Sequence, residues 1–348
     1  MCLNCVRNTQ SRYQINMPIG GYFSLELREG NAIPAWYERA VGFMSARSAL
    51  AAQLQSMNCE RAYVPTYNCE SVLQALNSIN VSVTHYKLNA NGDIPHTVLP
   101  AQNEVVLINN YFGLFDAQTQ RGAQRFGPHR SVVDAAQALY HHPKVPCPVI
   151  YSPRKFFGLP DGGFLVNSST AQMPHACDID SAAHCQHLLH RAAGDVARGY
   201  PHFQRAESRL DKCLQLSMSE VSRRLFLAQD FYVVAKKRRR NFRFLVHLLR
   251  GRVETIALQQ NAVPLCCPIF LPNAADLRLH LAKMNIFCPH YWPGNELDHS
   301  DPFAKKFLSS CVFVPCDQRY DFDDMRKIAA AVLEFLDKPA PILKLAIC

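Results

Sequence analysis

The chain has 348 residues, of which 48% are hydrophobic and 19% charged, and its formal net charge is +9 at pH 7. This composition is typical of a folded globular protein and excludes intrinsic disorder. The polar first ten residues argue against a secretory signal, and no apolar run approaches the roughly 20 residues that cross a bilayer. We therefore expect a soluble, cytoplasmic protein with one large core or two lobes.

Cysteine is unusually frequent, with 14 residues in the chain. The cysteines are scattered, often within apolar stretches, and lack the regular spacing of a small disulfide-stapled domain. We expect free, buried thiols in a reducing compartment. Cys2 and Cys5 form a lone Cys-x-x-Cys pair near the N-terminus, for which metal or redox use is the lesser alternative.

The strongest local concentration of positive charge is the run KKRRRNFRF at residues 236–244. Binding to nucleic acid is one interpretation. We favour a solvated helix face, because apolar residues recur through the same stretch at helical spacing. A basic surface would equally suit a small substrate that carries phosphate.

Between residues 45 and 168, short apolar runs alternate with helical patterns. Strands separated by helices indicate an α/β fold with a mainly parallel sheet covered by helices on both faces. Right-handed crossovers then bring the carboxyl ends of the strands to one edge of the sheet, where ligands bind. The sequence predicts helices over 45–57, 69–79 and 116–127, and strands over 61–68, 81–88, 104–113, 130–139, 148–158 and 162–168.

The rest of the chain has a different pattern of predicted elements. Residues 178–249 carry long helical patterns with an interruption at 199–203, and a compact α+β lobe follows. A polar break at Arg250 predicts a boundary between a large domain, 1–249, and a small C-terminal domain, 250–348. Within the small domain we expect strands over 267–272, 286–293 and 311–317, and helices over 273–285 and 321–336.

Several polar residues lie toward the carboxyl ends of the predicted strands, at the ligand-binding edge. The segment SVVD brings Asp134 there, with Gln137 one helical turn beyond it, and VIYS brings Ser152, with Lys155 three residues later. The helix that begins near residue 45 offers unpaired backbone N–H groups for an anion.

These groups are the ones that a pyridoxal phosphate enzyme needs. A lysine amine forms a Schiff base with the aldehyde, and apolar neighbours such as Phe156 and Phe157 favour its neutral form. A carboxylate pairs with the ring nitrogen, a helix N-terminus holds the phosphate, and a planar side chain stacks on the ring. Small residues, here Gly162 and Gly163, leave room for the ligand.

Each feature alone has an ordinary explanation. A lysine after a strand is usually a solvated surface residue, an aspartate at a strand end is usually a helix cap, and a tyrosine after a proline usually packs in the core. The argument therefore depends on the ordered set.

The ordered set resembles the DegT/StrS-type sugar aminotransferases, which are fold-type-I pyridoxal phosphate enzymes. The resemblance extends from GGYFSLEL near residue 20 to DMRKIAAAVLEFL near the C-terminus, and it includes YSPRKFFGLPDGG (151–163) and PCDQRY (315–320). It implies a large sheet domain, a small C-terminal domain, and an active site at the interface of a homodimer.

The resemblance also implies roles for individual residues. Lys155 would form the Schiff base and carry the proton, Asp134 would pair with the ring nitrogen, and Gln137 would lie near the ring hydroxyl. Tyr67 is the candidate for stacking on the ring, with Cys69 as the alternative. The cofactor phosphate would be bound by Ser152, Ser48 and the backbone of Ala46 and Arg47, and substrate contacts would come from His290 and Tyr291 in CPHYWP.

Three departures from the family pattern affect the substrate more than the cofactor. The usual Gly-Thr at the phosphate helix is replaced by Ala46, Arg47 and Ser48, and the serine-to-lysine spacing is two residues shorter. In the segment that reaches the partner subunit's cofactor, Gln215 replaces the asparagine and Ser217 the arginine.

A histidine- and cysteine-rich stretch, residues 175–190, raises the alternative of a metal site, since His184 and His187 have helical i,i+3 spacing. It contains no clean two-plus-two ligand motif, so we predict no metal. The predicted function is amino transfer from glutamate or glutamine to a keto sugar of a nucleotide-sugar. The alternatives are another pyridoxal phosphate reaction on a non-sugar substrate, or a non-catalytic relic that still binds the cofactor.

Overall fold

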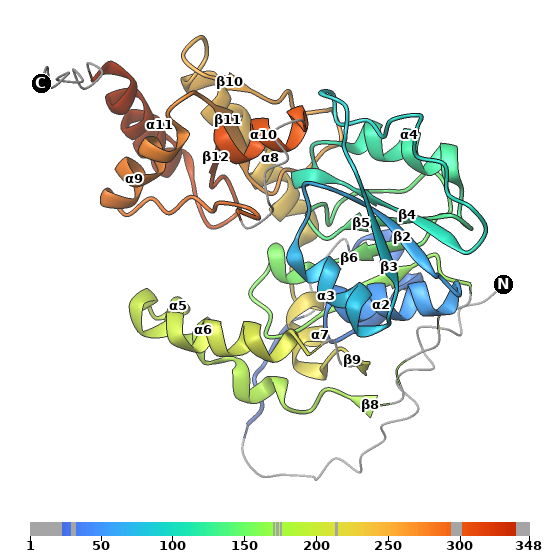
Figure 1. Cartoon of the computed structure of the whole chain (residues 1–348). Coiled ribbons are helices and arrows are strands. Elements are labelled where there is room, and N and C mark those ends of the chain that lie inside the picture. Colours follow the sequence, from blue (N-terminus) through green and yellow to red (C-terminus); the bar gives the residue numbers. More distant parts are fainter. Residues whose placement is uncertain are drawn as a thin grey trace, which may run out of the picture.

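Two β-sheets organise the chain in the computed structural model (Figure 1). The larger sheet includes both early and middle parts of the sequence, and the smaller one belongs to the C-terminal third. No helix in the part of the chain described is long and apolar enough to cross a membrane. The structure describes residues 23–28, 33–169, 171, 174, 176–212, 215–293 and 301–338.

The large sheet has the strand order β3-β2-β4-β5-β6-β7-β1-β9-β8. Strands β3, β2, β4, β5 and β6 are parallel neighbours, and β7 runs antiparallel to β6. The predicted α/β fold with a mainly parallel sheet is therefore confirmed. The strands are β1 Val41–Phe43, β2 Arg61–Pro65, β3 Ser82–Tyr86, β4 Glu104–Asn109, β5 Ser131–Ala135, β6 Val149–Tyr151, β7 Gly163–Val166, β8 Ala176–Cys177 and β9 Leu216–Ser217.

Both faces of this sheet are buried, as expected for parallel strands. Along β4, Val105 and Leu107 belong to one hydrophobic cluster, whereas Val106 and Ile108 belong to the other. Helix α2 (Ala46–Ser56) packs against β7, β1, β6 and helix α3 (Glu70–Ser78), and α4 (Asp116–Phe126) packs against β4 and β5. The three helices predicted in this region are all present.

A run of helices follows the large sheet. Helix α6 continues through Pro201, so the interruption predicted at 199–203 is wrong. The side chain of Asp195 caps its first turn, and α6 packs along α5 with Gly199 close to His190, so packing offsets the backbone bond that a proline removes. The helices are α5 Gln186–Ala192, α6 Val196–Leu210, α7 Glu220–Leu227 and α8 Phe231–Leu248.

The basic run at 236–244 lies on α8 and is exposed only in part. Lys236, Lys237 and Arg240 face solvent, as expected, whereas Arg238 is 2% exposed. The prediction of a solvated face is therefore right for most of the run and wrong for Arg238, whose contacts are described below.

The small sheet is antiparallel and consists of β10 (Glu254–Thr255), β11 (Cys267–Phe270) and β12 (Cys311–Val314). Helices α9 (Ala274–Lys283), α10 (Pro302–Ser309) and α11 (Phe322–Asp337) accompany it, and α8 packs on α11 and β11. Residues 286–293 form no strand, contrary to the prediction. Two prolines and the positive φ of Trp292 (57°) are incompatible with a regular ladder there.

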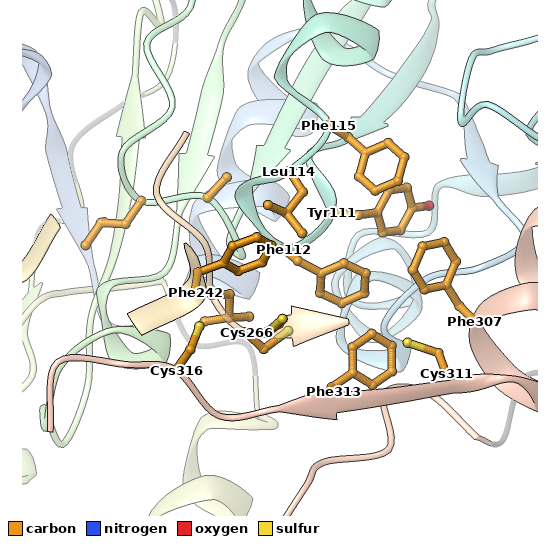
Figure 2. Close-up of a cluster of buried hydrophobic side chains, with 14 of the residues drawn as sticks. Tyr111, Phe112, Leu114, Phe115, Phe242, Cys266, Phe307, Cys311, Phe313 and Cys316 are labelled. Atoms are coloured by element: carbon orange, nitrogen blue, oxygen red, sulfur yellow. The ribbon is translucent and has the colours of Figure 1, made fainter. Parts of the chain in front are cut away.

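A continuous hydrophobic core joins the two sheets. Tyr111 and Phe112, which follow β4, meet Phe307 and Phe313 from α10 and β12 (Figure 2). Helix α8 ends at Leu248 and β10 begins at Glu254, so the polar break at Arg250 falls between them. The division into two domains at this point stays a prediction.

Candidate functional site

A cleft opens where β4 and β5 end and α2 begins. Its volume is about 480 Å³, counting the space that is open to solvent. Residues from distant parts of the sequence meet there, as the convergence of strand ends requires. The lining residues are Ala46, Arg47, Leu50, Cys69, Ser71, Val72, Asn109, Asn110, Asp134, Ala136, Gln137, Ile150, Lys155 and Trp292.

Asp134 is the acidic residue of the cleft. It lies at the end of β5, half-buried, and its Oδ1 accepts a hydrogen bond of 2.8 Å from the Ala136 N–H. Burial raises the pKa of Asp134, and the positive charge of Lys155 and the Ala136 hydrogen bond act in the opposite direction. The two charged residues are thus close enough to influence each other.

Lys155 ends the short 3-10 turn Pro153–Lys155 that follows β6. The residue is exposed and lines the cleft, and its amine has no hydrogen bond or ion pair with any residue that the structure describes. Phe156 and Phe157 are buried in the hydrophobic core. They anchor the turn in the core, whereas the sequence analysis expected them to surround the amine.

Gln137 and Asn110 each present one defined end of an amide to the cleft. The Gln137 Oε1 accepts from the Phe112 N–H at 3.3 Å, so its Nε2 is the free end, and that atom is buried without a partner among the described residues. The Asn110 Nδ2 donates to the Asp116 carboxylate at 2.5 Å, so its Oδ1 is the free end, which is also buried and has no partner in the described part of the chain. The cleft therefore offers a donor at Gln137 and an acceptor at Asn110.

Asn109 and Asn110 were not among the predicted site residues. Asn109 donates from Nδ2 to Asn68 Oδ1 at 2.8 Å, and its own Oδ1 has no partner in the described part of the chain. The predicted strand ran over 104–113 and placed the two asparagines inside it, whereas β4 ends at Asn109 and so brings both to the ligand-binding edge.

Helix α2 begins beside the cleft. Ser45 caps the helix by accepting from the Ser48 N–H at 3.1 Å, and the two hydroxyls are 3.0 Å apart. Ala46 and Arg47 line the cleft, whereas Ser48 is fully buried and does not. The binding of a phosphate by these residues stays a prediction. Arg47 also forms an ion pair with Asp211 at 2.5 Å.

The structure does not place Tyr67 in the cleft. Its ring is 1% exposed and stacks between Tyr111 and Phe307 in the aromatic core. The alternative, Cys69, lines the cleft and accepts a hydrogen bond from Ser71 Oγ at 2.9 Å. The Tyr67 ring points inward because it packs against Phe303 and Phe307 of α10. Cys69 is therefore the residue available to face a ring.

The remaining predicted site residues lie around the cleft but do not line it. Ser152 is buried before the Lys155 turn, and Gln215 donates to the Ser48 carbonyl at 3.4 Å within the same chain. His290 bonds the Leu308 carbonyl, and Tyr291 packs on Phe313. The next residue, Trp292, lines the cleft instead, because the chain bends at its positive φ.

Gly162 and Gly163 have a different role from the one predicted. A Cβ on Gly163 would lie 2.2 Å from the Ala46 nitrogen, and one on Gly162 would lie 2.8 Å from the Met218 side chain. The glycines therefore allow β7 to approach the start of α2, rather than leaving room for a ligand.

The histidine- and cysteine-rich stretch, residues 175–190, includes most of the short helix α5. Among the described residues, no group of three or more histidine, cysteine, aspartate or glutamate side chains could hold an ion. His187 packs on Phe203, and Cys185 bonds the Ser181 carbonyl. His175, Cys2 and Cys5 lie outside the described residues.

The fold is shared with solved aminotransferase structures. Helicobacter pylori PseC, described as an aminotransferase involved in the biosynthesis of pseudoaminic acid, aligns with a TM-score of 0.60 and 14% identity over 85% of this chain and 86% of its own. A DegT DnrJ EryC1 StrS aminotransferase from Brucella abortus aligns with 0.57 and 14% identity over 86% of each chain. The PLP form of Spr1654, a putative sugar aminotransferase from Streptococcus pneumoniae, aligns with 0.59 and 12% identity over 86% and 88%.

Comparison of sequences alone identifies no relative of this chain. No protein-family model matches the chain, and neither does any curated protein. At 12 to 14% identity the structural alignments establish the fold. The chain therefore has the α/β fold of the DegT/DnrJ/EryC1/StrS-type sugar aminotransferases.

Proposed function

We propose that this chain is a pyridoxal phosphate-dependent aminotransferase that moves an amino group from glutamate or glutamine to a keto sugar of a nucleotide-sugar. One observation carries the proposal. The Lys155 amine, which has no partner among the described residues, and the half-buried carboxylate of Asp134 share one cleft beside the start of a helix. The fold of the solved sugar aminotransferases supports it.

The residues present fit the cofactor. The buried, unpartnered Nε2 of Gln137 is a donor that a ring hydroxyl or its anion would satisfy. Ala46 and Arg47, at the start of α2, suit a phosphate, because backbone N–H groups and the helix dipole favour an anion there. Cys69, which lines the same cleft, would be the residue available to face the ring.

When bound, pyridoxal phosphate would supply an aldehyde that an amine can bond and a ring that withdraws electrons from a substrate carbon. The Asp134 carboxylate would hold a proton on the ring nitrogen through its negative charge. Lys155 Nζ would accept a proton from the substrate carbon and return it elsewhere, as general base and then general acid. The Asn110 carbonyl would accept a hydrogen bond from a substrate amine or hydroxyl.

The identity of the substrate, the cytoplasmic location and the homodimer are parts of the proposal. PseC is described as an enzyme of pseudoaminic acid biosynthesis and Spr1654 as a putative sugar aminotransferase, so a keto sugar is the substrate class with support. Biosynthesis of cell-surface polysaccharide is the corresponding role. The net charge of +9 suits a substrate that carries phosphate.

The decisive experiment is a visible absorption spectrum of the purified chain with added pyridoxal phosphate, before and after borohydride. We expect a band of the lysine-bound cofactor that reduction fixes to Lys155 and that Lys155→Ala lacks. Amino exchange with glutamate or glutamine should fall by about 10²–10⁴-fold in the variant, the usual contribution of general acid–base catalysis. A band that is indifferent to the substitution would refute the role of Lys155.

A second step separates an active enzyme from a protein that only binds the cofactor. Incubation with glutamate should convert the cofactor to its amine form and release 2-oxoglutarate. A protein with the band but without exchange for any amino donor would be a cofactor-binding relic.

A further inference from the structure

The short turn that carries Lys155 is tied down on both sides. On one side, Arg154 forms an ion pair with Glu207 of α6. On the other side, the Phe156 carbonyl accepts a hydrogen bond of 2.6 Å from Nε2 of Gln318, which lies beyond β12 in the small lobe. Lys155 itself is exposed, so its position depends on these two neighbours.

Gln318 belongs to PCDQRY, a motif of the sequence that the catalytic argument did not use. Its side chain has one orientation only. Nε2 donates to the Phe156 carbonyl, which can only accept, and Oε1 accepts from Nε of Arg238 at 2.7 Å, which can only donate. Gln318 therefore bridges Arg238 on α8 to the backbone next to Lys155.

Arg238 is a buried cation in an uncommon setting. It is 2% exposed, and none of the described carboxylates forms an ion pair with it. Its Nη1 donates to the carbonyls of Pro264 and Leu265 at 3.1 Å each, and its guanidinium carbon lies 4.5 Å from the centre of the Phe156 ring. Burial lowers the pKa of Arg238, and the charge of Asp317 opposes that shift.

Such a residue lowers the stability of the fold, because burying a charge that forms no direct ion pair is unfavourable. A methionine or leucine would fill a similar volume at lower cost. What an apolar residue could not supply is the pair of directed contacts that converge on Phe156, one through Gln318 and one through the ring face.

We propose that Arg238 and Gln318 are positioning residues that hold the Phe156 backbone and ring, and through them fix the direction of the Lys155 amine. The inference rests on the proposed role of Lys155. If so, residues from α8 and from the segment after β12 help to position Lys155, although neither Arg238 nor Gln318 lines the cleft.

The test uses the full-length chain and two variants. Gln318→Glu keeps an acceptor for Arg238 but removes the donor to the Phe156 carbonyl, so it breaks only the last link. Arg238→Met removes both contacts at similar volume. Arg239→Met is the matched control, because Arg239 is the next residue on α8 and donates to the Ala262 carbonyl, away from the turn.

Two kinds of measurement report the position of the amine. The first uses the bound cofactor: the rate at which it is incorporated, and the pH at which the band of the lysine-bound cofactor titrates. The second is competitive labelling of Lys155 by acetic anhydride in the chain without cofactor, followed by mass spectrometry. We expect incorporation to slow by up to about 100-fold in Gln318→Glu and Arg238→Met, as for other small displacements of a reacting group. The band should titrate at a shifted pH and labelling should change, while Arg239→Met matches the wild type.

The outcomes are distinguishable. If wild-type protein shows no band, the proposed function fails, and labelling of Lys155 still reports whether the two residues position it. If Gln318→Glu matches wild type in both measurements, the inference is overturned, even if Arg238→Met is impaired, because Arg238 would then act only through helix packing. Should Arg238→Met fail to fold, Gln318→Glu decides alone.

Discussion

Asp134 bears a negative charge at a position where burial opposes it. Burial raises its pKa in the folded chain, while an unfolded chain returns it to about 4. Between those two values the folded state binds more protons than the unfolded state. The folded chain therefore loses stability as the pH rises from about 4 through the folded pKa.

Replacing Asp134 with asparagine should remove that loss. In thermal denaturation without cofactor, the midpoint of Asp134→Asn minus that of wild type should increase as the pH rises from 4 and level off above the folded pKa. Amino transfer should fall by roughly 10²–10³-fold, the size of effect seen when a placed charge-stabilising group is lost. A difference that grows toward low pH would contradict the sign of the pKa shift.

At the scale of single residues, the sequence indicated which side chains gather at the cleft better than which side chains support them. Asp134, Gln137 and Lys155 line the cleft because each lies at or just beyond the end of a strand at the edge where ligands bind, and their catalytic roles stay predictions. Tyr67 was predicted to face the cleft but faces the core. Its position after β2 allows either direction, and the ring points inward because it stacks with Tyr111 and Phe307. Trp292 was missed because a positive φ has no sequence signal except in residues that favour it.

At the scale of elements, the contact between β7 and α2 determines where the start of α2 lies at the cleft. Gly163 touches the backbone of Ser45 and Ala46, so the helix start and the strand cannot separate without moving the cleft. This contact joins residues more than 100 positions apart and has no local sequence pattern beyond the two glycines.

Gly163→Ala should therefore affect both stability and cofactor affinity. Its Cβ would meet backbone atoms at 2.2 to 2.5 Å, which no side-chain rotation relieves. We expect a loss of about 1–3 kcal/mol in the free energy of unfolding, as for other overpacked sites, and weaker binding of pyridoxal phosphate by fluorescence titration. Gly158→Ala, whose Cβ would meet only the side chain of Leu188 at 3.2 Å, is the control.

The main elements were predictable because their patterns are long. Alternating strands and helices over residues 45–168 predicted the parallel sheet, and the helices α2, α3 and α4 follow the predicted ranges closely. The two-residue strands β8 and β9 were not predicted, because so short a strand carries no periodicity and forms only where a neighbour is already in place.

At the scale of the whole molecule, one continuous core connects the two sheets. The ring of Phe307, on α10, stacks with Tyr67 at a centroid distance of 5.6 Å. It also lies 5.5 Å from the ring of Phe112, which follows β4 (Figure 2), so residues of both parts of the chain share its burial. The hydrophobic core is therefore continuous across the predicted boundary at Arg250.

Phe307→Ala should destabilise the molecule as a unit. We expect a loss of about 3–5 kcal/mol, as for other buried phenylalanines, with a single unfolding transition in urea followed by both far-UV circular dichroism and tryptophan fluorescence. Two separate transitions in wild-type protein would show that the sheets unfold independently, and the shared core would then contribute little to either.

The chain has two tryptophans, and their surroundings differ. Trp36 stacks on Tyr151 at 4.3 Å in the buried core of the large sheet, whereas Trp292 lies on the wall of the cleft. Of the two, Trp292 lines the cleft and Trp36 does not, so Trp292 is the one placed for direct contact with a ligand. Its position gives the protein an intrinsic optical reporter for events in the cleft, and a Trp36→Phe background would isolate that signal without any added dye.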